Sequence, residues 1–132
     1  MLISCTSQNN NNAIRPNLSL ENTRWVLRSL YDQKIFTPES GKEAYIIFTK
    51  QTNRAAGNAG CNTFFSSYKI IKNNIKLGPV ARTRMFCEQQ MDTENNFIKA
   101  LEAAEKFRIE GDRLYLSDST EAVVGFEAVY MN

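Results

Sequence analysis

The sequence predicts an α+β protein that is mainly β, with an antiparallel, strongly curled sheet and one α-helix packed against it. Three observations predict this class. Short β-prone segments alternate with turn residues along most of the chain, residues 88–106 show helical periodicity, and the closely spaced Gly57 and Gly60 permit a sharp bend within a β segment. An antiparallel sheet needs cover on one face, and a single helix can supply it.

Length and charge restrict the possible classes of protein. A chain of 132 residues is long enough for one hydrophobic core but not for two. The net charge is +2, and the charged residues are scattered along the chain. Nucleic acid is therefore not an expected partner, because proteins that bind it usually carry a clustered basic face. We favour a monomer.

Composition also excludes several kinds of catalysis. The sequence contains no histidine, which removes the usual general base and the commonest metal ligand. Its three cysteines, Cys5, Cys61 and Cys87, form no CxxC pair and cannot make a four-ligand zinc site by themselves. We therefore expect no catalytic residues, no cofactor and no metal.

The first residues resemble a lipobox, the end of a bacterial lipoprotein signal. In that signal a Leu and a small residue precede a cysteine that becomes lipidated, as Leu2 and Ser4 precede Cys5 here. The hydrophobic stretch expected before the motif is missing, and an accidental cysteine at a frayed terminus is the alternative. Residues 6–12 are polar and uncharged. We predict a lipobox remnant and disordered Asn-rich tether over residues 1–21, followed by one domain over residues 22–132.

The domain is expected to begin with β structure. Strands are predicted over residues 23–31, 44–49 and 52–59, with a loop over residues 32–42. In the first strand, alternation places Trp25, Leu27 and Ser29 on one face and Leu30 on the other. Two hairpins are predicted, one over residues 68–77 with its turn at Lys72-Asn73, the other over residues 106–117 with its turn at Gly111-Asp112. Further strands are expected over residues 80–84 and 122–130.

Residues 88–106 form the predicted amphipathic helix. Its inner face is defined by residues that recur at spacings of three and four, with Phe97 beside Leu101: Met91, Asn95, Ile98, Leu101 and Ala104 or Glu105. Glu94 falls on the polar face in this interpretation. Glu88, Asp92 and Glu94 lie near the helix start, where they favour the helix dipole, and a hydrolytic pair of carboxylates there is the alternative.

Four sets of residues leave alternatives open. Asn62 is expected to fix the glycine bend and not to act in catalysis. Cys61 and Cys87 are expected to form a disulfide that stabilises the fold by roughly 3 kcal/mol, or else to be two buried free thiols. Met85 and Phe86 are expected in the core, and the alternative is a hydrophobic ligand cleft that they form with two other side chains. These two are Phe64 and Phe65.

The basic residues could line a rim that binds an anion, although we favour a plain solvent-exposed face of the sheet. They are Lys69, Lys72, Lys76, Arg82 and Arg84.

Several motifs together resemble the META domain family, to which the bacterial heat-shock protein HslJ belongs. They are the GNAGCNTFFSSY block of residues 57–68, the Gly78-Pro79 pair followed by TRMFC at residues 83–87, and a helix containing Glu94, Phe97 and Leu101 that leads into FRIEGDRL at residues 107–114. The motif residues expected to be structural are Trp25, Gly57, Gly60, Asn62, Tyr68, Gly78, Pro79, Met85 and Gly111. Phe86 stands where many relatives have Ala. The resemblance covers roughly residues 22–126.

This resemblance implies a partly open antiparallel β-barrel or strongly curled sheet with one helix. It also implies an envelope protein without known catalytic residues, loosely linked to heat shock, drug tolerance and secretion. We expect a non-enzymatic lipoprotein of the bacterial cell envelope, periplasmic or at the outer membrane. It would be held to the membrane through Cys5 and would bind an unknown envelope protein or an apolar ligand. The alternatives are a small hydrolase that uses carboxylates or Tyr68, and an inhibitor of an envelope hydrolase, which would present an exposed rigid loop.

Overall fold

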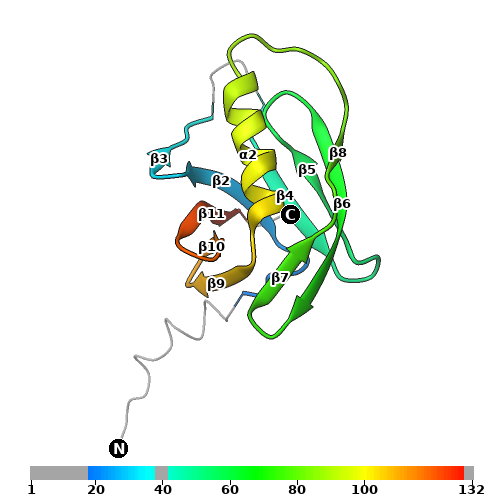
Figure 1. Ribbon diagram of the computed structural model, residues 1–132, viewed down its shortest axis with the longest axis vertical. Coiled ribbons are helices and arrows are strands. Elements are labelled where there is room, and N and C mark those ends of the chain that lie inside the picture. The colour runs from blue at the N-terminus through cyan, green and yellow to red at the C-terminus, as the bar shows by residue number, and fades with distance from the viewer. Residues whose placement is uncertain (1–17, 38–41, 130–132) are drawn as a thin grey trace, which may run out of the picture.

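The computed structural model describes residues 18–37 and 42–129. Within these residues, one antiparallel sheet of ten strands curls around one face of a single helix, α2 (Met91–Ala103) (Figure 1). The strands are β2 (Arg24–Leu30), β3 (Gln33–Lys34), β4 (Tyr45–Thr49), β5 (Arg54–Asn58), β6 (Thr63–Ile71), β7 (Asn74–Leu77), β8 (Ala81–Arg82), β9 (Lys106–Glu110), β10 (Arg113–Ser117) and β11 (Ala122–Val129).

The sheet closes on itself. Its strands follow the order β2, β4, β5, β6, β7, β9, β10 and β11, and β11 pairs back onto β2. The short strands β3 and β8 pair with β2 and β6. The closure is weakest between β7 and β9, which share the single register pair Asn74–Lys106. The result is a ring of hydrogen-bonded strands and not a regular barrel, which confirms the predicted curled sheet.

The helix fills the inside of the curl. Phe97, on α2, lies between Phe64 of β6 and Phe126 of β11, with ring centroids 5.8 and 5.9 Å apart. All three rings are buried, and burying a side chain of this size contributes about 1.5–3 kcal/mol. One helical residue thus joins two distant strands of the ring. The predicted helix is confirmed, although it is shorter at both ends than the range 88–106.

Strand β2 departs from simple alternation. A β-bulge at Arg28 shifts its register against β11. Beyond the bulge Leu30 is buried in the core and Ser29 is only half-buried. The predicted alternation, which placed Ser29 on the buried face and Leu30 on the other, is therefore wrong after Leu27.

Both predicted hairpins form at their predicted turns. Lys72 and Gly111 have φ of 57° and 62°, the left-handed conformation that tight hairpin turns require. Two other predictions are corrected. The predicted loop over residues 32–42 contains the short strand β3, and β8 covers only two residues of the predicted strand 80–84.

The folded part of the chain begins earlier than the predicted boundary at residue 22. Leu20 is buried, and its carbonyl oxygen accepts a hydrogen bond of 2.9 Å from Nε1 of the fully buried Trp25. Leu20 therefore belongs to the domain and not to the tether. Cys5, the tether over residues 6–17, Gly41 and Tyr130 lie outside the described residues.

Candidate functional site

The glycine-rich bend is the hairpin loop between β5 and β6. Gly57 lies in β5, where it passes so close to β4 that a Cβ would lie 1.9 Å from the carbonyl oxygen of Tyr45. Gly60 lies in the loop with φ of 123°, which L side chains rarely adopt. Its N–H donates to Oδ1 of Asn58 at 2.8 Å. The two glycines are thus required for different reasons, a close approach and a left-handed turn.

A buried carboxylate from α2 fixes this loop. Glu94 is 0% exposed. Its Oε1 accepts hydrogen bonds from the backbone N–H groups of Cys61 and Asn62 at 3.0 and 2.7 Å. Its Oε2 accepts from Nδ2 of Asn62 at 2.7 Å and from Nη1 of Arg82 at 3.0 Å. A buried charge is tolerated when it is paired and hydrogen-bonded, as here, so the interaction is structural in character.

Asn62 extends the network to the segment before the helix. Its Oδ1 accepts hydrogen bonds from Oγ1 of Thr83 at 2.8 Å and from the backbone N–H of Met85 at 2.7 Å. Its Nδ2 also lies 3.0 Å from the carbonyl oxygen of Met85. Asn62 therefore fixes the bend, as the sequence suggested, and also anchors a second segment.

A disulfide completes the arrangement. Cys61 and Cys87 are joined, with their Cα atoms 5.8 Å apart. The structure therefore has the bridge and not the alternative of two free thiols. Together the disulfide, Asn62 and Glu94 tie the β5–β6 loop to the segment over residues 83–90, which we call the 83–90 loop.

The 83–90 loop presents two large apolar side chains to solvent. Met85 is 55% exposed and Phe86 is 76% exposed. The prediction that placed both in the core is therefore wrong. The alternative cleft does not form as proposed either, because Phe64 is buried against Phe97 in the core. Phe65 is 47% exposed, and the guanidinium of Arg54 lies 5.0 Å from the centre of its ring.

The remaining motif residues are structural where the structure describes their contacts. Tyr68 is buried, and its hydroxyl donates a hydrogen bond of 2.5 Å to Oε2 of Glu21. Burial, together with this carboxylate, raises the pKa of Tyr68 above its usual value. Gly78 lies where a Cβ would meet Oγ of Ser67 at 2.6 Å. Pro79 is exposed and follows it directly.

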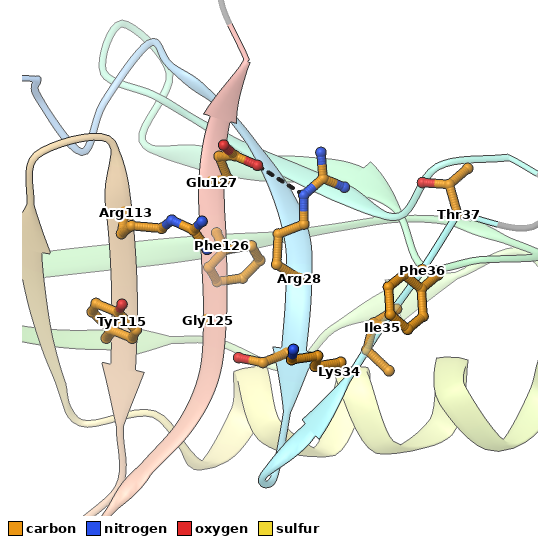
Figure 2. A pocket seen from close by; sticks show the side chains of 11 residues that line it. Arg28, Lys34, Ile35, Phe36, Thr37, Arg113, Tyr115, Gly125, Phe126 and Glu127 are labelled. Carbon is orange, nitrogen blue, oxygen red and sulfur yellow. Dashed lines mark hydrogen bonds and ion pairs between the residues drawn. The ribbon is translucent and has the colours of Figure 1, made fainter.

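A groove of about 440 Å³ lies on the outer face of the sheet (Figure 2). Its walls come from β2, β10, β11 and the segment formed by the end of β3 and the residues after it. The lining residues are Arg28, Ser29, Lys34, Ile35, Phe36, Thr37, Arg113, Tyr115, Gly125, Phe126 and Glu127. Gly125 is one of these lining residues. A larger side chain would not fit there without a shift, because its Cβ would lie 2.4 Å from Oγ of Ser29.

The groove carries more positive than negative charge. Glu127 accepts a hydrogen bond of 3.0 Å from Nε of Arg28, so these two charges are paired. Neither Lys34 nor Arg113 forms an ion pair with another residue of the described ranges. The groove therefore presents the positive charges of Lys34 and Arg113 beside the aromatic rings of Phe36 and Tyr115. The sequence analysis missed this site, because its residues come from four separate segments that only the ring closure brings together.

Two further findings concern metals and membranes. Among residues 18–37 and 42–129, no group of three or more Cys, Asp or Glu side chains is placed to hold a metal ion. In the same part of the chain, no helix combines the length and the apolar character needed to cross a bilayer.

The ring of strands and the inserted helix define the class of protein, a small β domain. In it, Glu94, Asn62 and the disulfide tie the β5–β6 loop to the 83–90 loop. The sequence model of the META domain matches residues 18–130, and the chain belongs to the META domain family. The chain matches none of the curated proteins.

Solved structures share the fold. One is the NMR structure of a protein from Burkholderia xenovorans, with a TM-score of 0.69, 21% identity and 85% of each chain covered. Another is the crystal structure of a DUF4847 family protein from Bacteroides vulgatus, with a TM-score of 0.60 and 12% identity, covering 86% of this chain and 96% of that one. At these identities the likeness concerns the fold alone.

Proposed function

We propose that the protein is a non-enzymatic, lipid-anchored binding module of the bacterial cell envelope, which recognises a partner protein through the 83–90 loop. Its anchor would be the lipidated Cys5 of the lipobox-like N-terminus. The disulfide between Cys61 and Cys87 supports a place outside the cytoplasm, because disulfides persist in oxidising compartments such as the periplasm.

The observation that carries the proposal is an exposed apolar pair on a fixed backbone. Met85 and Phe86 project into solvent, while Asn62 holds Met85 through both its N–H and its carbonyl group and Cys87 is covalently tied to the β5–β6 loop. Aromatic side chains are common hot spots of protein interfaces. A loop that is already ordered loses less entropy on binding, so its apolar contacts yield more affinity.

The titratable groups favour binding over catalysis. The four hydrogen bonds to the buried Glu94 occupy both of its oxygens. Tyr68 and Glu21 are within hydrogen-bond reach of each other, yet neither lines the groove. A hydrolase would need such groups in a concave site open to substrate. An inhibitor of an envelope hydrolase is the second candidate, because an exposed, rigid loop is the element by which such an inhibitor would act.

Capture from native envelopes tests the proposal. The lipidated full-length protein serves as bait beside the variants Met85→Ala and Phe86→Ala. We expect Phe86→Ala to reduce recovery of a specific partner by about ten-fold or more, as loss of an interface hot spot does. Phe36→Ala is the matched control, because Phe36 is 77% exposed but lies in the groove.

Two outcomes would contradict the proposal. Loss of the partner with Phe36→Ala and not with Phe86→Ala would move the binding site to the groove. Recovery of the same proteins by wild type and by all three variants would show that the loop has no part in binding. Anchoring is tested separately, by labelling cells with a radioactive fatty acid. We expect label on the wild-type protein and none on Cys5→Ala.

A further inference from the structure

The hairpin of β6 and β7 carries an unfavourable arrangement of charge. Lys69 and Lys76 are register partners on neighbouring antiparallel strands, and both are exposed. Like charges directly opposite each other destabilise a sheet. Lys72, in the turn, and Lys106, whose Cα pairs with Asn74 of β7, add two more exposed positive charges.

The same hairpin exposes an apolar side chain. Ile71, the last residue of β6, is 67% exposed. It borders a hollow of about 380 Å³ with mainly apolar walls, whose lining residues are Lys69, Ile71, Asn74, Ile75, Lys76, Glu105 and Lys106. Glu105 supplies the only negative charge among these lining residues. An aliphatic side chain surrounded by lysines is therefore left open to solvent.

We propose that this hairpin is a contact site for an anionic lipid bilayer. Ile71 would enter the boundary between headgroups and acyl chains, where apolar side chains are stabilised. The four lysines would lay their stems along that boundary and place their ammonium groups among the lipid phosphates. An anionic surface would also relieve the repulsion between Lys69 and Lys76.

The position of the hairpin suits such a contact. In Figure 1 the β6–β7 turn and the start of the coloured ribbon ahead of β2 both lie toward the lower end of the described part of the molecule. Twelve residues, 6–17, separate Cys5 from Leu18, and a chain of that length spans at most about 43 Å. This step rests on the proposed anchoring at Cys5, which would hold the hairpin near the same bilayer and raise its effective concentration there.

Sedimentation with vesicles tests the proposal on the unlipidated Cys5→Ala protein. We expect it to bind vesicles containing phosphatidylglycerol and not vesicles of phosphatidylcholine alone, with binding weakened by salt. Each of Lys69→Gln and Lys76→Gln should weaken binding about five-fold, the effect of one basic residue near an anionic surface. Ile71→Ser should also weaken it. Lys42→Gln, at an exposed position ahead of β4, removes the same charge away from the hairpin and should leave binding unchanged.

Several outcomes would overturn the proposal. They are equal binding to neutral and anionic vesicles, equal loss with Lys42→Gln, or binding of inorganic phosphate to the hairpin without any binding to vesicles. The variants should unfold at the same urea concentration as wild type or a higher one, so a folding defect can be recognised. Because the protein used is not lipidated, failure of Cys5 to accept a fatty acid in cells leaves this test intact.

Discussion

The carboxylate of Glu94 accepts hydrogen bonds of 2.7 Å from both the backbone N–H and the side-chain Nδ2 of Asn62. One residue of the helix thereby fixes the backbone and the side chain of one loop residue. Asn62 in turn holds Met85. The orientation of the exposed 83–90 loop therefore depends on a buried contact on the other side of Asn62.

Removing Glu94 should destabilise the fold strongly. Glu94→Ala would leave the N–H groups of Cys61 and Asn62 and the side chain of Arg82 without their partner. Each buried donor left unsatisfied in this way costs about 1–3 kcal/mol, which urea unfolding would measure. Asp92→Asn, an exposed change in the same helical turn, should alter stability by no more than about 0.5 kcal/mol. Similar values for both variants would contradict the role of Glu94.

The disulfide should make its own contribution to the free energy of unfolding. Cys61 and Cys87 are 26 residues apart, and closing a loop of that length stabilises by about 3 kcal/mol on the chain-entropy model. The double variant Cys61→Ser Cys87→Ser should therefore unfold at a clearly lower temperature. Dithiothreitol should lower the midpoint of wild type and leave that of the double variant unchanged. An unchanged wild-type midpoint after complete reduction would argue against the contribution.

The two structural glycines should respond differently to alanine. Gly57→Ala would place a Cβ 1.9 Å from a backbone atom of β4, which cannot move without disturbing the sheet. Gly111→Ala would meet nothing within 4 Å and would suffer only from φ of 62°, a cost of about 1–2 kcal/mol. We expect Gly57→Ala to be poorly folded and Gly111→Ala to fold, as judged by circular dichroism. A stable Gly57→Ala protein would show that β4 and β5 can separate easily.

Tyr68 should make the protein sensitive to alkaline pH. Its pKa is raised by burial and by the nearby Glu21, so the folded protein retains a proton that the unfolded chain loses near pH 10. This stabilisation is present below pH 10 and is lost as the pH rises beyond it. Tyr68→Phe should flatten the decline in unfolding free energy above pH 10. Some slope should remain, because burial also raises the pKa of Tyr31. If Tyr68→Phe declined in unfolding free energy above pH 10 as steeply as wild type, Tyr68 would not be the group responsible.

Local patterns predicted most of the fold. Turn residues such as Lys72-Asn73 and Gly111-Asp112 determine hairpins by their own backbone preferences, and those hairpins formed. The bulge at Arg28 could not be predicted, because it depends on pairing with β11 about 100 residues later. The pairing of β2 with β11, which closes the ring, could not be predicted from local patterns for the same reason.

The candidate site was predicted less well. Glu94 was placed on the polar face because carboxylates are rarely buried. Glu94 lies three, four and seven residues before Phe97, Ile98 and Leu101. This spacing places it on the same helix face as those buried residues and could have predicted its burial. The place of Met85 and Phe86 beside Cys87 at the helix entry, and the tendency of Met to fill gaps, predict core residues. Their exposure follows from the bonds of Asn62 and Cys87, which the sequence does not reveal.

The pairing of β2 with β11 joins the beginning and the end of the domain, as in the hydrogen bond between Arg28 and Glu127, 99 residues apart. Such long-range contacts make folding slow. During synthesis, the leading strand must wait for the last one before the ring can close. The chain would thus leave the ribosome with its ring still open until the final strand has emerged.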